Sequence, residues 1–430
     1  MDANGNHKIM RVLFLMTARS YRNAAFLNAA EHLGIEVVQA VDMPKELSQS
    51  WSNGFGVDFM NIDESVSTIK DYHAVHPLRA ILPVDDSGSA LAASAGEALG
   101  LPHNSQKAAS ATRDKLIFRR SLQGSRLNTP RFEEYITSED ISPLITKIGF
   151  PCVVKPRSLN GSRGVIRADN REELDAAISR TARLVRSIRG QSQETAVSIL
   201  VESYIPGKEV AVEGILDGGC LEILALFDKP DPLEGPFFEE TIYVTPSRLP
   251  EELQDEIART TARAAKVIGL TTGPVHAELR FNNEGVWIVE IAGRSIGGLC
   301  SQTLQFGAGG SLEEIILRQA CGLNFSSLQR SDEARGVMMI PIPGAGLLRG
   351  VDGIDQAKNT PLIENVEITA PLNNTVTPLP EGDGYLGFIF SRGNSPQGVE
   401  EALRLAHQKL TFKIDILLPV LQGNMGDYSR

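Results

Sequence analysis

Short apolar runs alternate with helical segments along the first hundred residues. The predicted strands are residues 9–16, 35–41 and 80–84, and the predicted helices are residues 22–33 and 87–99, which stop at Gly34 and Gly100. The helices carry Ala and Leu at helical spacing, whereas the strands are short and mainly apolar. Such alternation is typical of a small parallel sheet wrapped by helices. We therefore expect an α/β domain over residues 1–104.

The middle of the chain mixes helices with strands that follow one another directly. The predicted strands are residues 150–155, 197–204, 209–215 and 221–227 and a hairpin of residues 275–281 and 286–291. The predicted helices are residues 105–123, 171–186, 250–268 and 311–321. From residue 330 the chain is strand-rich, with a helix at 396–410 and a final strand. We expect two α+β subdomains, residues 105–199 and 200–328, and a C-terminal α+β lobe, residues 329–430.

Composition and charge exclude several classes of protein. The 42 Lys and Arg against 53 Asp and Glu leave a net charge of −11, which disfavours a protein whose main task is to grip a nucleic-acid backbone. A membrane span needs about 20 apolar residues, and the N-terminal apolar run of residues 9–16 is far shorter. The four cysteines form no CxxC pair, which disfavours a disulfide framework or a zinc ribbon. We expect a cytoplasmic protein that contacts neither nucleic acid nor membrane.

A glycine-containing loop follows the strand that ends at Lys155. The sequence FPCVVKPRSLNGSRGV places Gly161, Ser162 and Gly164 in this loop. Glycines let backbone amides approach an anion closely, and a neighbouring lysine adds a positive charge for phosphate oxygens. The sequence does not fit the Walker phosphate loop, and no HRD or DFG run suggests a protein kinase. The alternative is a plain hairpin loop with a solvated Lys155.

A second motif pairs two carboxylates on one face of the predicted hairpin. If residues 283–285 form a three-residue loop with Gly285 left-handed, Glu278 lies opposite Glu290 and His276 opposite Ala292. Like charges that face each other are destabilising unless a cation lies between them, and oxygen ligands suit Mg²⁺. On this register the opposite, apolar face holds alternate residues, among them Val275, Ala277, Leu279, Phe281, Trp287, Val289 and Ile291. The alternative is a solvated acidic face compensated by Arg280 and Arg294.

Between these motifs, the stretch LVESYIPGKEVAVEG turns at Pro206-Gly207. A strand that ends near Glu202 leaves backbone donors and acceptors free for the edge of a planar base. Glu209, seven residues on, can accept two ribose hydroxyls. The same residues also form an ordinary hairpin turn.

In this order, from about residue 105 to residue 323, the motifs resemble the ATP-grasp superfamily, whose nucleotide lies between two α+β subdomains. The resemblance implies an ATP-grasp fold preceded by a Rossmann-like α/β domain. It also implies nucleotide contacts from Lys115, Lys155, Gly161, Ser162, Gly164, Glu202, Tyr204, Ile205 and Glu209. It makes Glu278 and Glu290 magnesium ligands and places Arg294 beside the transferred phosphoryl group.

One departure and three further stretches point to a branch of the superfamily. Many members carry Asn where this chain has Ala292, which leaves the second metal ion with fewer protein ligands. The stretches AGRSIGG, GPFFEETIYVTP and GPVHAELR are similar to those of bacterial L-amino acid ligases. In that branch an acidic residue of the first domain holds the substrate's α-amino group. This implies Asp86, with Asp85 as the neighbour that could replace it, and substrate contacts from His276, Arg294 and Gly297.

The resemblance implies an ADP-forming carboxylate–amine ligase that uses ATP and Mg²⁺, with Mn²⁺ as a substitute, and joins two amino acids into a dipeptide. On this interpretation the catalytic residues are Lys155, His276 and Arg294. Two alternatives stay open. One is the same chemistry on a purine precursor or, as in biotin carboxylases, on bicarbonate, and the other is a regulatory ATP-binding module without turnover. The partners are small molecules, and a homodimer is one assembly that the resemblance allows.

Overall fold

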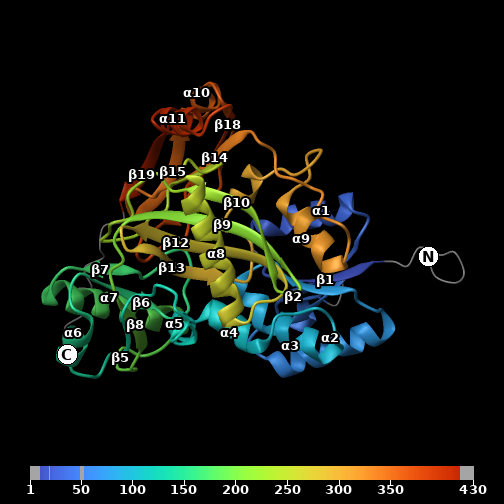
Figure 1. Cartoon of the computed structure of the whole chain (residues 1–430), viewed down its shortest axis with the longest axis horizontal. Helices are drawn as coiled ribbons and strands as arrows, with labels where there is room; N and C mark the ends of the chain where they lie inside the picture. Colours follow the sequence, from blue (N-terminus) through green and yellow to red (C-terminus); the bar gives the residue numbers. More distant parts are fainter. Residues whose placement is uncertain (1–9, 19, 49–52, 417–430) are drawn as a thin grey trace, which may run out of the picture.

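The computed structural model describes residues 10–18, 20–48 and 53–416, and within them the strands form four sheets (Figure 1). The mixed α/β and α+β architecture expected from the sequence is present. A parallel sheet forms the N-terminal domain, and the rest of the chain is built on antiparallel sheets. No helix in these ranges is both long enough and apolar enough to cross a membrane.

The N-terminal domain is a four-stranded parallel sheet in the order β3-β2-β1-β4. Its strands are β1 (Arg11–Met16), β2 (Glu36–Asp42), β3 (Gly54–Val57) and β4 (Ala80–Pro83), and its helices are α1 (Arg22–His32), α2 (Ile62–Val75) and α3 (Ser89–Leu99), with short 3₁₀ turns η1 (Lys45–Ser48) and η2 (Asp86–Gly88). Leu13 and Leu15 pack toward α2 and α3, whereas Val12 and Phe14 pack toward α1 and the distant helix α9 (Leu312–Cys321). Both faces of the sheet are therefore buried, in keeping with its mainly apolar strands.

The sequence did not predict β3 or α2. Helix α2 nevertheless carries an apolar stripe at helical spacing, since Ile62, Val66 and Tyr72 pack with buried Ile69 against the sheet. The predicted helix 105–123 is also wrong, because it consists of two helices, α4 (Gln106–Arg113) and α5 (Lys115–Leu122). Asp114 between them has an extended backbone, and its side chain accepts hydrogen bonds from the N–H groups of Leu116 and Ile117. This N-cap starts α5 in a new direction.

A second, antiparallel sheet carries the glycine loop. Its strands, in the order β5-β8-β6-β7, are β5 (Phe132–Ile136), β8 (Ser198–Ser203), β6 (Cys152–Pro156) and β7 (Ile166–Ala168). Helices α6 (Ser142–Ile148) and α7 (Arg171–Arg189) pack on it and close its apolar core. The loop joins β6 to β7, so it leaves the sheet directly after Lys155 and Pro156.

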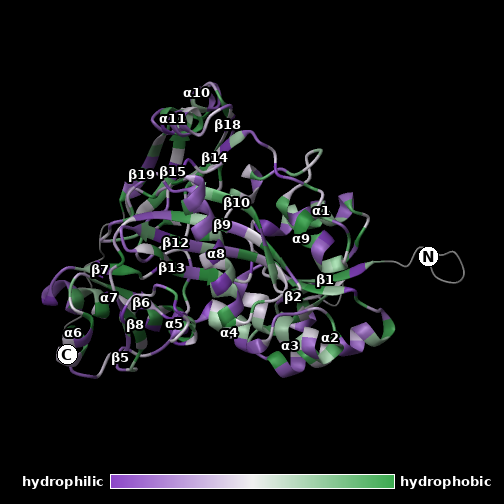
Figure 2. Ribbon diagram, viewed as in Figure 1, coloured by the Kyte–Doolittle hydropathy of each residue, from purple (hydrophilic) through white to green (hydrophobic). Residues whose placement is uncertain are grey.

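The largest sheet has eight strands in the order β13-β12-β9-β10-β11-β14-β18-β16. The strands are β9 (Lys208–Asp217), β10 (Cys220–Asp228), β11 (Ile242–Thr245), β12 (Gly273–Asn282), β13 (Gly285–Ala292), β14 (Ala334–Ile340), β16 (Ile363–Ile368) and β18 (Gly387–Gly393). Helix α8 (Glu251–Ile268) lies across it (Figure 1) and buries Ile257, Thr261, Ala264 and Ile268, one stripe of an otherwise polar helix (Figure 2). The sheet takes strands from both sides of residue 329, and the predicted domain division stays a prediction.

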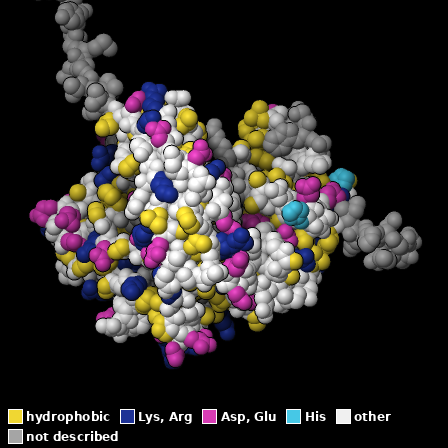
Figure 3. All heavy atoms as spheres, turned by 90° about the horizontal axis from the view of Figure 1, so that it is seen from above, with side chains coloured by type: hydrophobic (Ala, Val, Ile, Leu, Met, Phe, Trp, Pro, Cys, Tyr) yellow, Lys and Arg dark blue, Asp and Glu magenta, His cyan; other side chains and the backbone are white. Residues whose placement is uncertain are grey.

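The C-terminal lobe completes the chain. It contains a three-stranded sheet of β17 (Thr375–Val376), β15 (Gly346–Asp352) and β19 (Thr411–Ile416) and the helices α10 (Ile354–Lys358) and α11 (Pro396–His407). Earlier in the chain, a 3₁₀ turn η3 (Cys300–Thr303) precedes α9. Helix α11 packs on β14 and β18, which joins the lobe to the large sheet through one apolar core. On the face seen in Figure 3, acidic and basic side chains are interspersed.

Candidate active site

One cavity of about 950 Å³ collects the predicted site residues. It lies where the carboxyl end of the parallel sheet, the glycine loop and the large sheet meet. Its walls include Asp85, Asp86, Lys115, Lys155, Gly161, Ser162, Glu202, Tyr204, Ile205, Glu209, His276, Glu278, Glu290, Arg294 and Gly297. Gly164 is the exception, since its N–H donates to the carbonyl of Pro380 at 2.8 Å and is not part of the cavity wall. Residues spread over 200 positions of sequence therefore share one chamber.

The β12–β13 hairpin presents the two carboxylates as the alternation predicts. Glu278 pairs with Glu290 and His276 with Ala292. The predicted three-residue loop is wrong, however, because Asn282 pairs with Gly285 across a two-residue turn. A bulge on β13, between the partners of Glu278 and Leu279, absorbs the difference of one residue.

The bulge changes which side chains of β13 are buried. Beyond it, Leu279 pairs with Ile288, and Val286 and Ile288 fill the apolar core where Trp287 and Val289 were expected. Val289 instead lines the cavity. A shift of one residue moves a strand's side chains to the opposite face, so the error in the loop produced the error in the core.

Each of the paired carboxylates meets a positive side chain. A carboxylate oxygen of Glu290 lies 3.3 Å from the ammonium nitrogen of Lys115. A carboxylate oxygen of Glu278 lies 3.6 Å from the ammonium nitrogen of Lys229 and 3.6 Å from Nε2 of His276. Oxygen-only carboxylate donors that face one cavity fit a divalent cation such as Mg²⁺. Glu278 and Glu290 are the residues that would hold it.

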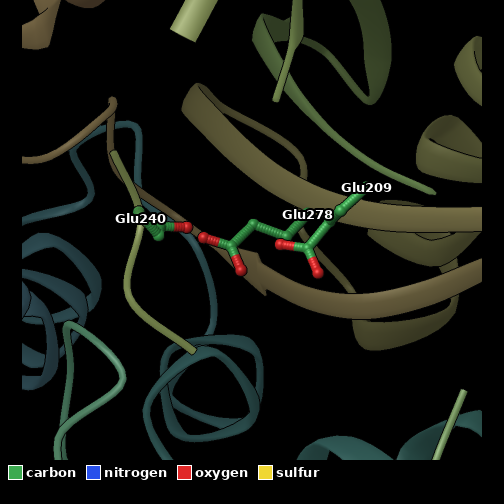
Figure 4. Close-up of side chains that lie close together, drawn as sticks. All are labelled: Glu209, Glu240 and Glu278. Carbon is green, nitrogen blue, oxygen red and sulfur yellow. The ribbon is translucent and has the colours of Figure 1, made fainter. Parts of the chain in front are cut away.

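Glu240, Glu278 and Glu209 form a cluster of three carboxylates (Figure 4). One oxygen of each lies within 4.8 Å of the others, and the ammonium group of Lys229 lies 2.8 Å from Glu209 and 2.5 Å from Glu240. Burial, reinforced by the charge of Glu278, raises the pKa of Glu240 to about 7 although Lys229 opposes the shift. Burial disfavours the charge of Lys229, but the three carboxylates raise its pKa above the usual range.

Lys229 was not among the residues predicted from the sequence, and Glu240 had no predicted role. Glu240 stands in the stretch GPFFEETIYVTP, which supported the resemblance, so a signal existed for it. Lys229 directly follows β10, and nothing in its neighbourhood distinguishes it from a solvated lysine. Only the packing of β9, β10 and β12 brings it among the carboxylates.

The predicted nucleotide lysine Lys155 belongs to a buried triad. Its ammonium group lies 2.6 Å from Glu202, which also accepts hydrogen bonds from Arg119 at 2.5 and 3.3 Å. Burial opposes ionisation of Glu202, but Arg119 and Lys155 outweigh it and lower the pKa to about 2. Arg119 also donates to the carbonyls of Ile288 and Val289 at 2.9 Å each, so it ties α5 to the β12–β13 hairpin. The Glu202 side chain thus orients Lys155.

The hinge residues lie beside two arginines. The carbonyl of Ile205 accepts a hydrogen bond from Arg280 at 2.7 Å, and the Tyr204 ring lies 4.4 Å from the Arg167 guanidinium and 5.3 Å from that of Arg280. Glu209 accepts from Arg280 through one oxygen and from Lys229 through the other. Each carboxylate oxygen has a second lone pair, which remains suitable for a ribose hydroxyl.

The far end of the cavity holds the predicted substrate residues. Asp86 accepts a hydrogen bond from Arg294 Nε at 2.6 Å, and both side chains are largely buried. Burial opposes ionisation of Asp86, yet Arg294 outweighs it and lowers the Asp86 pKa. Asp85 points elsewhere and accepts from the hydroxyls of Thr17 and Ser20 at 3.1 Å each. A buried Asp–Arg pair complements an amino acid, which carries an ammonium and a carboxylate group.

His276 should make the stability of the folded protein depend on pH. Burial disfavours its charge, but Glu213, buried completely and 2.5 Å from Nδ1, outweighs burial and raises the His276 pKa from 6.5 to about 9. Its contribution to stability is full below pH 6.5 and is lost as the pH rises to 9. We expect the free energy of unfolding of ligand-free protein, measured with urea, to fall by up to about 3 kcal/mol across this range.

The matched control is the double variant Glu213→Gln/His276→Gln, which removes both charges of the pair together. This component of the pH dependence should disappear in it. If the wild-type protein and the double variant lose stability in parallel between these pH values, His276 is neutral in the folded state.

Comparisons with known families agree with the resemblance. The sequence matches the ATP-grasp domain family over residues 148–303 and the L-amino acid ligase C-terminal domain 2 family over residues 338–415. It is 25% identical over 273 residues to an alanine–anticapsin ligase of Bacillus subtilis, a match that covers 60% of this chain and 57% of the relative. A D-alanine–D-alanine ligase of Cupriavidus metallidurans is 24% identical over 197 residues, 44% of this chain and 57% of that protein. The matches therefore span little more than half the length of these relatives.

Solved structures share the fold over nearly the whole chain. An L-amino acid ligase from Bacillus licheniformis superposes with a TM-score of 0.76 at 24% identity, covering 96% of this chain and 100% of that one. A phosphoribosylglycinamide synthetase from Anaerococcus prevotii gives a TM-score of 0.66 at 16% identity, covering 94% and 100%. At these identities the similarity shows the fold alone.

Proposed function

We propose that the chain, which matches the ATP-grasp domain over residues 148–303 and the L-amino acid ligase C-terminal domain 2 over residues 338–415, is an ADP-forming ligase that joins two amino acids into a dipeptide. The observation that carries this proposal is the Asp86–Arg294 pair, which lines the same cavity as the facing carboxylates Glu278 and Glu290. Asp86 complements an α-ammonium group, and Arg294 complements the carboxylate that is activated. A site built for bicarbonate has no need of the aspartate.

In the first step the substrate carboxylate attacks the γ-phosphorus of ATP, and the bond between that phosphorus and the β,γ-bridging oxygen breaks to release ADP. Phosphoryl transfer depends mainly on positioning and charge neutralisation. Lys155, held by Glu202, and Lys115 supply positive charge for the phosphates. A divalent cation held by Glu278 and Glu290 would neutralise phosphate charge. Asp86 would hold the substrate's ammonium group.

In the second step the neutral amine of the acceptor attacks the acyl carbon of the acyl phosphate, the bond from that carbon to the phosphate oxygen breaks, and inorganic phosphate leaves while the proton lost by the amine passes to the phosphate or to water. The tetrahedral intermediate carries a negative oxygen, which the Arg294 guanidinium would stabilise. Arg294 also donates to the carbonyl of Ser295 at 2.9 Å, so its position beside the cavity is fixed from two sides. No covalent intermediate with the protein is needed.

We expect one ADP and one phosphate for each peptide bond formed. The reason is attack at the γ-phosphorus, which leaves the α,β-linkage intact. The measurement is phosphate release with ATP and Mg²⁺ over pairs drawn from the twenty amino acids, with nucleotides and peptides identified by mass spectrometry. Reactions with single amino acids and without amino acids are the controls. Formation of AMP and pyrophosphate contradicts the mechanism, and turnover with bicarbonate alone favours a carboxylase.

A further inference from the structure

We propose that Asn160 of the glycine loop is a positioning residue that couples the nucleotide site to the amino acid site through Asp86. The inference rests on the proposed function and adds to it a link between the two substrates. Its basis is a hydrogen bond from Asn160 Nδ2 to Asp86 Oδ2 of 3.0 Å, between a loop of the second sheet and the N-terminal domain. The residues are 74 positions apart, so the contact belongs to the tertiary structure.

Asp86 connects three parts of the cavity. Its Oδ2 accepts from Asn160 in the glycine loop and from Arg294 Nε at 2.6 Å. Its Oδ1 takes part in no hydrogen bond with the residues that the structure describes. A carboxylate offers about four lone-pair positions, so an ammonium group can bind Oδ1 while Oδ2 keeps both donors. The substrate's ammonium group and the loop's amide then share one carboxylate.

The glycine loop is anchored separately to the C-terminal lobe. Arg163 donates through Nε to the Glu381 carbonyl at 2.7 Å and through Nη1 to Asp383 at 3.0 Å. The N–H of Gly164 donates to the Pro380 carbonyl at 2.8 Å. Loss of the Asn160 side chain should therefore leave the loop folded. The contacts of Asn160 and Arg163 lie on different domains, so they can be removed independently.

The coupling follows from this arrangement. A nucleotide that holds the loop over its phosphates also holds the Asn160 amide against Asp86, which fixes that carboxylate in the orientation the ammonium group meets. An amino acid on Asp86 in turn favours the loop position that covers the nucleotide. Coupling between two binding sites is reciprocal, so each substrate must strengthen the other by the same factor. For one hydrogen bond to a charged group we expect a factor of roughly ten.

The test measures this factor directly. The affinity of the full-length protein for the Mg²⁺ complex of adenylyl-imidodiphosphate is determined by isothermal titration calorimetry, without and with saturating amino acid. The amino acid is the one whose pairs give the most phosphate release in the screen described under the proposed function. The wild-type protein should bind the nucleotide about tenfold more tightly with the amino acid present. In Asn160→Ala the ratio should fall to nearly one, with little change in affinity for nucleotide alone.

Arg163→Gln is the matched control, because it removes a contact of the same loop on the side of the C-terminal lobe. It should weaken nucleotide binding equally with and without the amino acid and keep the wild-type ratio. Three outcomes overturn the inference while the proposed function stands. In the first the wild-type protein shows a ratio of one, in the second Asn160→Ala keeps the ratio of the wild-type protein, and in the third both variants lose the ratio to the same extent. A wild-type protein that turns over but uses no amino acid refutes the proposed function itself, and the inference with it.

Discussion

Replacing Glu290 with Gln is expected to lower kcat by roughly 100-fold or more, the scale on which the loss of one electrostatic contact to a transition state is felt. Glu290 lies on the cavity wall opposite Glu278, and the substitution keeps its shape while it removes one negative charge. Two carboxylates that face one cavity suit a divalent cation, and a single one binds it more weakly. The Lys115 ammonium, 3.3 Å from Glu290, also loses its partner.

The measurement is kcat at saturating ATP over a Mg²⁺ titration, together with Mn²⁺ binding followed by electron paramagnetic resonance. Glu284→Gln is the matched control, because Glu284 belongs to the turn of the same hairpin and is exposed. It should retain wild-type turnover and metal binding. Normal turnover of Glu290→Gln at millimolar Mg²⁺ contradicts the metal-ligand assignment and favours the alternative, in which the hairpin carries a solvated acidic face.

Asp86→Asn is expected to weaken the first amino acid by about 2–5 kcal/mol, the range found when one partner of a buried charge pair is removed. The ammonium group loses its counter-charge, and Arg294 is left without the carboxylate that it contacts at 2.6 Å. An unpaired Arg294 costs free energy in the free enzyme, and an unpaired ammonium group costs free energy in the bound enzyme. The affinity for nucleotide alone should change far less, because Lys155 and the hinge residues lie on other elements.

The measurement is KM for each amino acid and the affinity for the nucleotide alone. Asp85→Asn is the control, since Asp85 faces Thr17 and Ser20. A substrate without the α-amino group should be used about equally by wild-type enzyme and Asp86→Asn. An unchanged KM in Asp86→Asn with a raised KM in Asp85→Asn shifts the assignment by one residue, and no effect of either removes the N-terminal domain from substrate selection.

The sequence alone determined the features that depend on neighbouring residues. Alternation with a period of two placed Glu278 and Glu290 on the same face of the hairpin, because each strand's pattern sets its two faces. Short, mainly apolar runs identified β1, β2 and β4 of the parallel sheet, since strands buried on both faces need no regular polar alternation. The order of the glycine loop, hinge and hairpin produced the resemblance to the ATP-grasp superfamily, and the family match over residues 148–303 agrees with it.

The tertiary structure alone decided which distant charges meet. Lys229 lies among Glu209, Glu240 and Glu278 because β9, β10 and β12 are neighbours in one sheet. The turn and bulge of the hairpin escaped prediction because two compensating shifts leave the register at Glu278 unchanged.

The contacts of Arg119 with Glu202 and of Asn160 with Asp86 likewise join separate parts of the fold. Local periodicity reports only which face of an element is apolar. A buried ion pair depends on the position of its partner across the fold, and the residues beside it in the chain carry no trace of that position.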